Sequence, residues 1–252
     1  MPDSKPALER LKRRLERLER PRRSDAKMFA LGAEAVDARL GGGLACAAMH
    51  EICAFDALDR SAASGFALML ASRASDGAPL LWVREDRDER LHGRLYGQGV
   101  RELGIDPDTV LIVTVADTLA ALRVAGDMVA CTGAGAVVIE PSGAAKPLDL
   151  TASRRLVLAC EKSGVTVFVL REAANGFASA AATRWMAGAA PSTPLAGDAP
   201  GSPAFAVELA RHRGGIPPFA LNLEWDRDER IFRQPALSRR LPAFAERGPL
   251  AA

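Results

Sequence analysis

Apolar positions along the chain form two kinds of pattern, short continuous runs and longer segments with helical spacing. Short runs rich in β-branched residues are typical of strands that are buried on both faces. Such runs occur at residues 80–83, 111–115, 136–140 and 165–170. Segments with helical spacing separate them, at residues 91–103, 117–130 and 150–162. Strands separated by helices of this length form parallel β-α-β units with right-handed crossovers, so the pattern predicts an α/β protein with a mostly parallel central sheet.

An earlier segment, residues 29–70, combines strand and helix patterns around a polar loop. A glycine-rich turn at residues 41–43 leads into a short apolar run that ends at Cys53. A polar octet, residues 54–61, follows, and residues 66–70 then have helical character. This order of strand, loop and helix is that of a phosphate-binding P-loop.

The octet itself departs from the phosphate-binding pattern G-x-x-x-x-G-K-[ST]. Only Ser61 fits, while Ala54 and Asp59 replace the two glycines and Arg60 replaces the lysine. Glycine is needed because the backbone N–H groups of the loop must turn inward towards the phosphate without a Cβ atom in the way. The Asp59 carboxylate would also repel a phosphate, by about 1 kcal/mol in water and about 4 kcal/mol at a surface-like dielectric for unit charges ~4 Å apart. We therefore predict a degenerate P-loop that retains its shape and binds no cofactor.

The C-terminal part has a different pattern. Residues 171–203 are rich in Ala, Gly, Ser and Pro, interrupted at residues 182–186, and this composition predicts a long loop that is functional or disordered. Residues 205–213 and 221–225 alternate between apolar and polar positions on either side of a Gly-Gly pair, which predicts an antiparallel hairpin at the C-terminal end of the sheet. Residues 227–252 are rich in Arg, interrupted by Pro, and expected to form a tail.

Charge is distributed unevenly along the chain. Residues 1–27 hold ten Lys or Arg against five Asp or Glu, a net charge of +5, and the remaining residues carry 23 against 26, a net charge of −3. The body is therefore not a general DNA-binding protein, and we expect DNA binding to be weak or absent. The chain divides into a basic N-terminal arm at 1–27, a core domain at 28–226 and the Arg- and Pro-containing tail at 227–252.

The basic arm has leucines at steps of three and four residues, ending before Pro21. This spacing predicts a helix with a single apolar seam. The seam residues are Leu8, Leu11, Leu15 and Leu18. The seam packs either on the protein's own core or on a partner or second copy, and the working hypothesis is that these four leucines are interaction residues.

Composition disfavours several classes of protein and site. The chain has no run of about 18 apolar residues, and its charged N-terminus lacks the apolar core of a secretory signal, so we expect a cytoplasmic protein without membrane association. The four cysteines form no C-x-x-C pair, and His50, His92 and His212 are scattered along the sequence. We therefore expect buried thiols in a reducing compartment and no metal site.

The order of elements resembles the ATPase core of the RecA recombinases, and local runs resemble the ImuA family of damage-inducible mutagenesis proteins. Residues 31–43 followed by residues 50–52 are similar to the glycine-rich turn and the strand that lead into the RecA P-loop. Tyr96 with residues 102–106 is similar to the segment after the second core strand of that family. The similarity covers residues 28–226. The runs that indicate ImuA in particular are residues 150–156 and 181–185.

The resemblance also assigns positions to two glutamates. Glu85 falls near the water-activating glutamate of RecA, and Glu140 stands at the end of the Walker B strand in place of the usual aspartate. Because the loop is degenerate, we expect neither of them to be a catalytic residue. The chain is interpreted as a pseudo-ATPase rather than an enzyme.

By the same resemblance, ImuA proteins act in the SOS response with ImuB and an error-prone DnaE-type polymerase in translesion synthesis. The expected function is a non-catalytic RecA-like adaptor in DNA-damage-induced mutagenesis, with self-association or contact with RecA as further options. Two alternatives stay open: an active P-loop-type ATPase or recombinase with an irregular nucleotide site, and a cell-division inhibitor of the SulA type that binds FtsZ. The degenerate octet argues against the first alternative, and the length of the chain argues against the second.

Overall fold

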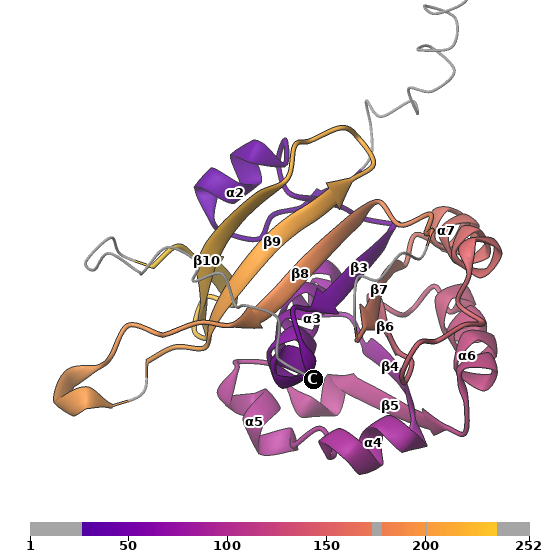
Figure 1. Ribbon diagram of the computed structural model, residues 1–252, viewed down its shortest axis with the longest axis horizontal. Helices are drawn as coiled ribbons and strands as arrows, with labels where there is room; N and C mark the ends of the chain where they lie inside the picture. The colour runs from indigo at the N-terminus through magenta and orange to yellow at the C-terminus, as the bar shows by residue number, and fades with distance from the viewer. Residues whose placement is uncertain (1–26, 173–177, 200, 236–252) are drawn as a thin grey trace, which may run out of the picture.

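A computed structural model of the chain describes residues 27–172, 178–199 and 201–235. Within these residues a nine-stranded sheet forms the centre of the molecule, in the order β11-β10-β9-β8-β3-β7-β6-β4-β5 (Figure 1). A separate two-stranded ribbon pairs β1 with β2. The strands are β1 Met28–Phe29, β2 Leu44–Ala45, β3 Met49–Ala54, β4 Leu80–Glu85, β5 Val110–Val115, β6 Ala136–Glu140, β7 Thr166–Arg171, β8 Thr183–Ala189, β9 Ala204–His212, β10 Phe219–Asp226 and β11 Ile231–Arg233.

The described helices lie between the strands in the order expected of α/β proteins. The α-helices are α2 Glu34–Arg39, α3 Arg60–Ser75, α4 Asp86–His92, α5 Gly97–Glu102, α6 Thr118–Ala130 and α7 Leu150–Ser163. Three short 3-10 helices are η1 Ala57–Asp59, η2 Pro107–Thr109 and η3 Ala196–Asp198. None of the helices in the described ranges is both long enough and apolar enough to cross a membrane.

The sheet has a parallel part and an antiparallel part. Strands β8, β3, β7, β6, β4 and β5 run parallel to one another, whereas the pairs β8–β9, β9–β10 and β10–β11 are antiparallel. The α/β class, the mostly parallel sheet and the C-terminal hairpin predicted from the sequence are therefore confirmed. In the hairpin, Phe205 lies opposite Leu223 and Val207 opposite Leu221.

Each face of the sheet has its own core, because successive side chains of a strand point to opposite faces. On β6, Val138 belongs to the core around α3, while Val137 and Ile139 belong to the core beneath α6 and α7. Figure 1 shows α6 and α7 side by side on one face of the parallel strands. The α3 core includes rings from distant parts of the chain, with Phe66 against Trp185 on β8. The face that carries α3 also carries the residues of the candidate site.

Strand β8 is the largest departure from the sequence prediction. The sequence indicated a loop over residues 171–203 with an interruption at residues 182–186, but Thr183–Ala189 is a strand that pairs with β3 on one side and β9 on the other. Its sequence contains Gly188 and two alanines, so its strand propensity is weak. The segment forms a strand because of its tertiary contacts, since Trp185 and Ala187 are fully buried.

The helix predicted at residues 91–103 is also wrong as a single element. It divides into α4 and α5, because Gly93 adopts a positive φ of 83° that ends α4. The charged residues 86–90, which precede the predicted helix, belong to α4. Near the C-terminus, β11 pairs with β10, so the sheet continues past the boundary at residue 226 that the sequence suggested. The predicted leucine seam of the N-terminal arm lies outside the described residues.

Candidate functional site

In the loop between β3 and α3, two aspartate side chains accept hydrogen bonds from backbone N–H groups. Asp56 Oδ1 accepts hydrogen bonds from the backbone N–H groups of Leu58, at 2.8 Å, and Asp59, at 3.2 Å. Asp59 is 6% exposed, and its Oδ1 accepts from the N–H of Ala189 on β8 at 3.0 Å. A Cβ atom on Gly188 would lie 2.7 Å from the Asp59 carboxyl carbon. The loop thus adopts a compact turn whose carboxylate fits against a glycine of the neighbouring strand.

At the start of α3, two arginines and two acidic residues form a buried group that we call the Arg60 cluster: Arg60, Arg84, Asp88 and Glu140. Arg60 Nη2 lies 2.8 Å from Asp88 Oδ1 and 3.3 Å from Glu140 Oε1. Arg84 lies 3.0 Å from Asp88 Oδ2 through Nη2 and 3.3 Å from Glu140 Oε2 through Nε. None of the four residues is more than 6% exposed. The two positive and two negative side chains therefore compensate one another out of contact with water.

Neutral donors complete the surroundings of Glu140. Trp82 Nε1 donates to Glu140 Oε2 at 2.9 Å, and the Ser64 hydroxyl donates to Oε1 at 3.3 Å. Burial raises the pKa of the Glu140 carboxyl, and the nearby Asp88 raises this pKa further, while Arg84 and Arg60 act in the opposite direction. Because a buried charge is costly unless it is paired, Glu140 depends on the two guanidinium groups beside it.

The structure brings together only some of the residues that the sequence singled out. Arg60 and Glu140 meet in the cluster, and Ser61 lies beside it on α3. Glu85 does not join them, because it points to the opposite face of β4, where it accepts a hydrogen bond from the hydroxyl of Thr118 at the start of α6. Ala54 is buried at the end of β3.

Sequence reasoning missed two members of the cluster, Arg84 and Asp88. They come from the charged run that follows the strand at residues 80–83. Arg84 lies on β4 and Asp88 lies in the first turn of α4. Their ion pair joins a strand to the helix that follows it, so neither a strand period nor a helix period in the sequence marks the two residues as neighbours.

A second buried charge group, the Glu51 cluster, lies on the opposite face of the sheet and consists of Glu51, Arg171 and Arg184. Arg171 Nε donates to Glu51 Oε1 at 3.0 Å, and Arg184 Nε donates to Oε2 at 2.8 Å. Arg171 Nη2 also donates to the Leu148 carbonyl at 2.9 Å. The cluster ties three adjacent strands together, since its members come from β3, β7 and β8.

A cavity of about 470 Å³ opens between α3 and the α4–α5 segment, next to the Arg60 cluster. Its polar lining includes Arg60, Ser61 and Glu140, and its apolar lining includes Trp82 and Tyr96. Cavities of this size accommodate small molecules or a few side chains. Charged groups and an accessible space meet at this point of the structure.

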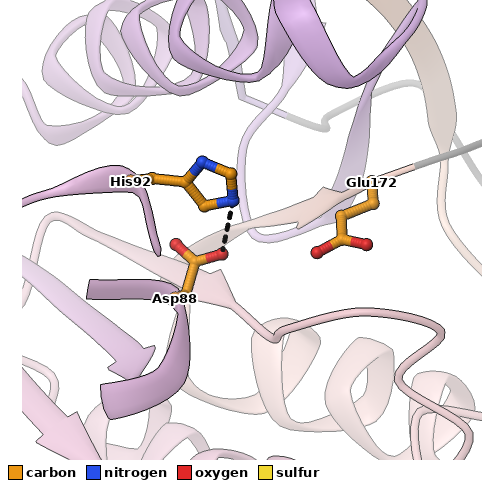
Figure 2. A group of neighbouring side chains, drawn as sticks. All are labelled: Asp88, His92 and Glu172. Atoms are coloured by element: carbon orange, nitrogen blue, oxygen red, sulfur yellow. Dashed lines mark ion pairs between the residues drawn. The ribbon is translucent and has the colours of Figure 1, made fainter. Parts of the chain in front are cut away.

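Asp88, His92 and Glu172 are the described residues whose side chains come close enough together to suggest a metal site (Figure 2). His92 Nε2 lies 3.8 Å from Asp88 Oδ1, and Glu172 accepts from the backbone N–H of Gly143 at 2.8 Å. Both oxygens of Asp88 already accept from guanidinium groups. A metal ion at this point would have two cationic neighbours, so the arrangement fits ion pairing better than metal coordination.

Comparison with known proteins supplies the family. No family model matches the chain. The chain is 31% identical over 211 residues to the protein ImuA of Caulobacter vibrioides strain NA1000 / CB15N, covering 77% of this chain and 82% of that protein. The ImuA protein of Caulobacter vibrioides strain ATCC 19089 / CIP 103742 / CB 15 matches to the same extent. The similarity inferred from the sequence motifs is thereby confirmed, and the chain belongs to the ImuA family.

Proposed function

We propose that this chain is a non-catalytic adaptor in DNA-damage-induced mutagenesis, built on a RecA-like core with a degenerate P-loop. Membership of the ImuA family supports the place in mutagenesis. The strand order supports the RecA-like core, because the loop-bearing strand β3 lies inside the parallel sheet, between β7 and β8. Its partners are an ImuB-like protein and an error-prone DnaE-type polymerase, as the resemblance implies.

The observation that carries the non-catalytic part of the proposal is the state of the loop. A phosphate-binding loop needs inward-facing backbone N–H groups and a free cation. Here the N–H groups of Leu58 and Asp59 donate to the Asp56 carboxylate. The cation, Arg60, is paired with Asp88 and Glu140. A nucleotide would have to displace the loop's own carboxylates and separate buried ion pairs.

Nucleotide binding is tested by thermal melting of the full chain with millimolar ATP and Mg²⁺, together with an ATPase assay. We expect no ATP turnover above background. We also expect no rise in melting temperature, because a ligand whose concentration equals its Kd raises the free energy of unfolding by only about 0.4 kcal/mol. Ser61→Ala is the matched control, because Ser61 is exposed and is the one P-loop position that fits the pattern. An ATP-dependent rise that disappears in Ser61→Ala would contradict the proposal.

Partner choice is tested by purifying the tagged chain from cells with damaged DNA. We expect to recover the ImuB-like protein and the DnaE-type polymerase. Recovery of FtsZ in their place would support the cell-division alternative. Deletion of the gene should lower the frequency of damage-induced mutations, and the Ser61→Ala protein should restore it as well as the wild type does.

The predicted leucine seam gives a more specific test of association. The double change Leu11→Glu with Leu15→Glu should abolish recovery of partners or of a second copy while leaving the melting temperature of the core almost unchanged. A groove that buries the four leucines would gain about 6–12 kcal/mol before the ordering cost. A melting temperature lowered by several degrees, with partners still bound, would show that the seam packs on the protein's own core.

A further inference from the structure

The antiparallel strands have an open face that the proposed function does not use. On the side of the sheet opposite α3, the helices α6 and α7 pack on the parallel strands (Figure 1). Beyond these helices, β8, β9 and β10 turn half-buried or exposed side chains outward, among them Met186, Glu208 and Ala220. The three residues form one row across the strands, since Glu208 lies opposite both Met186 and Ala220. Part of the sheet is therefore accessible from this side.

Positive charge gathers at one end of this face. Arg211 on β9 lies directly opposite Arg184 on β8, and like charges in this arrangement are destabilising. The nearby carboxylate of Glu51 already pairs with Arg184 and Arg171. One negative charge is thus shared by two arginines before the charge of Arg211 is added, so this end of the face carries an excess of positive charge.

The contacts of Arg211 leave part of its guanidinium unsatisfied. Its Nη2 donates to the Ala181 carbonyl at 3.0 Å, its Nε is buried without a partner, and among the described residues it forms no ion pair with a carboxylate. Its Nη1 also lacks a hydrogen-bond partner there, but this atom is not buried. Burial lowers the pKa of Arg211, and the neighbouring Arg184 lowers it further. An anion that approaches Nη1 from solvent would compensate this charge.

Three exposed arginines lie around the same place. Arg213, two residues further along β9, has its Nη1 3.5 Å from the Ala180 carbonyl. The N–H of Ala180 donates to Ser153 Oγ at 3.1 Å, which connects this segment to α7. The next two residues of α7, Arg154 and Arg155, are exposed. Within the ranges that the structure describes, none of these three arginines pairs with a carboxylate, so their charges are available to a ligand.

The charges beyond the arginines favour a protein segment over a nucleic acid. Glu208 and Glu224 lie on the same open face, because residues two apart on a strand point to the same side. A nucleic acid carries a negative charge at every nucleotide, so a strand that extended across β9 and β10 would be repelled there. A protein segment can place carboxylates at the arginines and uncharged side chains over Met186 and Ala206, which are half-buried on this face.

We propose that this face binds a segment of a partner protein that carries two or more Asp or Glu residues next to apolar ones. The carboxylates pair with Arg211 and Arg213, whose N–H groups match the two oxygens of a carboxylate in a plane. The apolar side chains pack over Met186 and Ala206. The inference rests on the proposed role as an adaptor and adds one surface that serves it. A nucleic acid at the same face is the competing outcome.

The probe is a phage-displayed library of random dodecapeptides, selected on the full chain and counter-selected on the double variant Arg211→Gln with Arg213→Gln. Glutamine keeps a polar side chain and removes the charge. The matched control is Arg101→Gln with Arg123→Gln, because these two arginines are exposed on α5 and α6, away from β8 and β9. Thermal melting verifies that both double variants are folded.

We expect enriched peptides that carry at least two Asp or Glu residues. Their Kd should rise at least tenfold with the Arg211 and Arg213 double variant and should be unchanged with the control. Replacing the acidic residues of a peptide by their amides should weaken its binding to the unchanged chain by a similar factor, which tests the same contact without altering the protein.

Two results would overturn the inference. One is failure to enrich acidic peptides, or binding that is indifferent to Arg211 and Arg213 or to the acidic residues of the peptide. The other is a single-stranded oligonucleotide that binds more tightly than the peptides, displaces them and depends on the same arginines. Either result would leave the proposed adaptor function intact, because that function is tested separately by nucleotide binding and by the frequency of damage-induced mutations.

Discussion

The two buried charge clusters lie on opposite faces of one sheet and use the same side chains differently. In the Glu51 cluster, one carboxylate receives two arginines, one on each oxygen, and Arg171 also donates to a backbone carbonyl. In the Arg60 cluster, two carboxylates share two arginines, and Arg60 still has two nitrogens without a partner in the described structure. The first cluster has the contacts of a structural tie, whereas the second borders an open cavity.

This difference shows that burial of charge does not by itself indicate a functional site. The three carboxylates, Glu51, Asp88 and Glu140, are all buried, and each of them pairs with two guanidinium groups. What distinguishes them is the cavity, whose lining includes Arg60, Arg84 and Glu140 and no member of the Glu51 cluster. Substitutions at the Glu51 cluster should therefore affect the stability of the fold alone, and substitutions at the Arg60 cluster should also change the wall of the cavity.

The largest effect is expected from Glu51→Gln. Removing this charge leaves Arg171 and Arg184 without the anion they share, and breaking a buried ion pair in this way costs about 3–5 kcal/mol. Urea unfolding followed by circular dichroism measures the loss. The control is Glu161→Gln on the exposed side of α7, which should change stability by less than about 0.5 kcal/mol. A loss below about 1 kcal/mol for Glu51→Gln would show that the cluster is not a structural tie.

A smaller loss, about 1–3 kcal/mol, is expected from Asp88→Asn. The reason is that Glu140 remains to compensate both Arg60 and Arg84 after Asp88 is neutralised. The matched control is Asp86→Asn two residues earlier on α4, whose ion pair with Arg90 is solvent-exposed and worth about 0–1 kcal/mol. Equal effects of the two variants on urea unfolding would mean that the Arg60 cluster contributes no more than a surface pair.

The pH dependence of stability distinguishes the clusters further. The pKa of Glu140 is raised in the folded protein, so the folded state binds this proton more tightly than the unfolded chain does. The free energy of unfolding should therefore fall as pH rises from the ordinary Glu value, about 4.3, through the raised pKa. Glu140→Gln lacks this titration, so the difference in unfolding free energy between the wild type and the variant should shrink over that range. Parallel pH profiles of the two proteins would contradict the prediction.

The smallest effect concerns a thiol beside the Glu51 cluster. Burial, and secondarily Glu51, raise the pKa of Cys53 to about 11, whereas Cys131 is exposed. At pH 8, iodoacetamide should label Cys131 first and reach Cys53 only through unfolding. In Glu51→Gln, labelling of Cys53 should accelerate in proportion to the lost stability, as measured by mass spectrometry. An unchanged rate would mean that this part of the sheet opens independently of the cluster.

Much of the fold could be predicted because its strands carry strong local signals. The β-branched runs that became β5 and β7, and the alternating hairpin of β9 and β10, are interpretable without tertiary information. Strand β8 could not be predicted in the same way. Its alanines and glycine favour a loop, and it is a strand because Trp185 is buried between β8 and α3. Burial of this kind depends on elements far away in the sequence.

The candidate site could be predicted only in part, because some of its contacts join elements that are distant in the sequence. Arg60 and Glu140 stood out because their positions follow from the order of strand, loop and helix. Asp88 did not, since its role depends on where α4 begins and on which face of that helix meets α3. The partner of Glu85 could not be predicted either, because the contact with Thr118 joins β4 to α6, and two α-helices, a 3-10 helix and a strand lie between them in the sequence.

The fit between Asp59 and Gly188 has an evolutionary consequence. Replacing Asp59 by glycine, as a nucleotide-binding loop requires, removes the acceptor of the Ala189 N–H and leaves an unfilled notch beside β8. A side chain added at Gly188 to fill that notch collides with the carboxylate as long as Asp59 remains. Loop and strand must therefore change together, and neither step alone is neutral. Because of this mutual dependence, a single substitution at either position is expected to lower the stability of the protein.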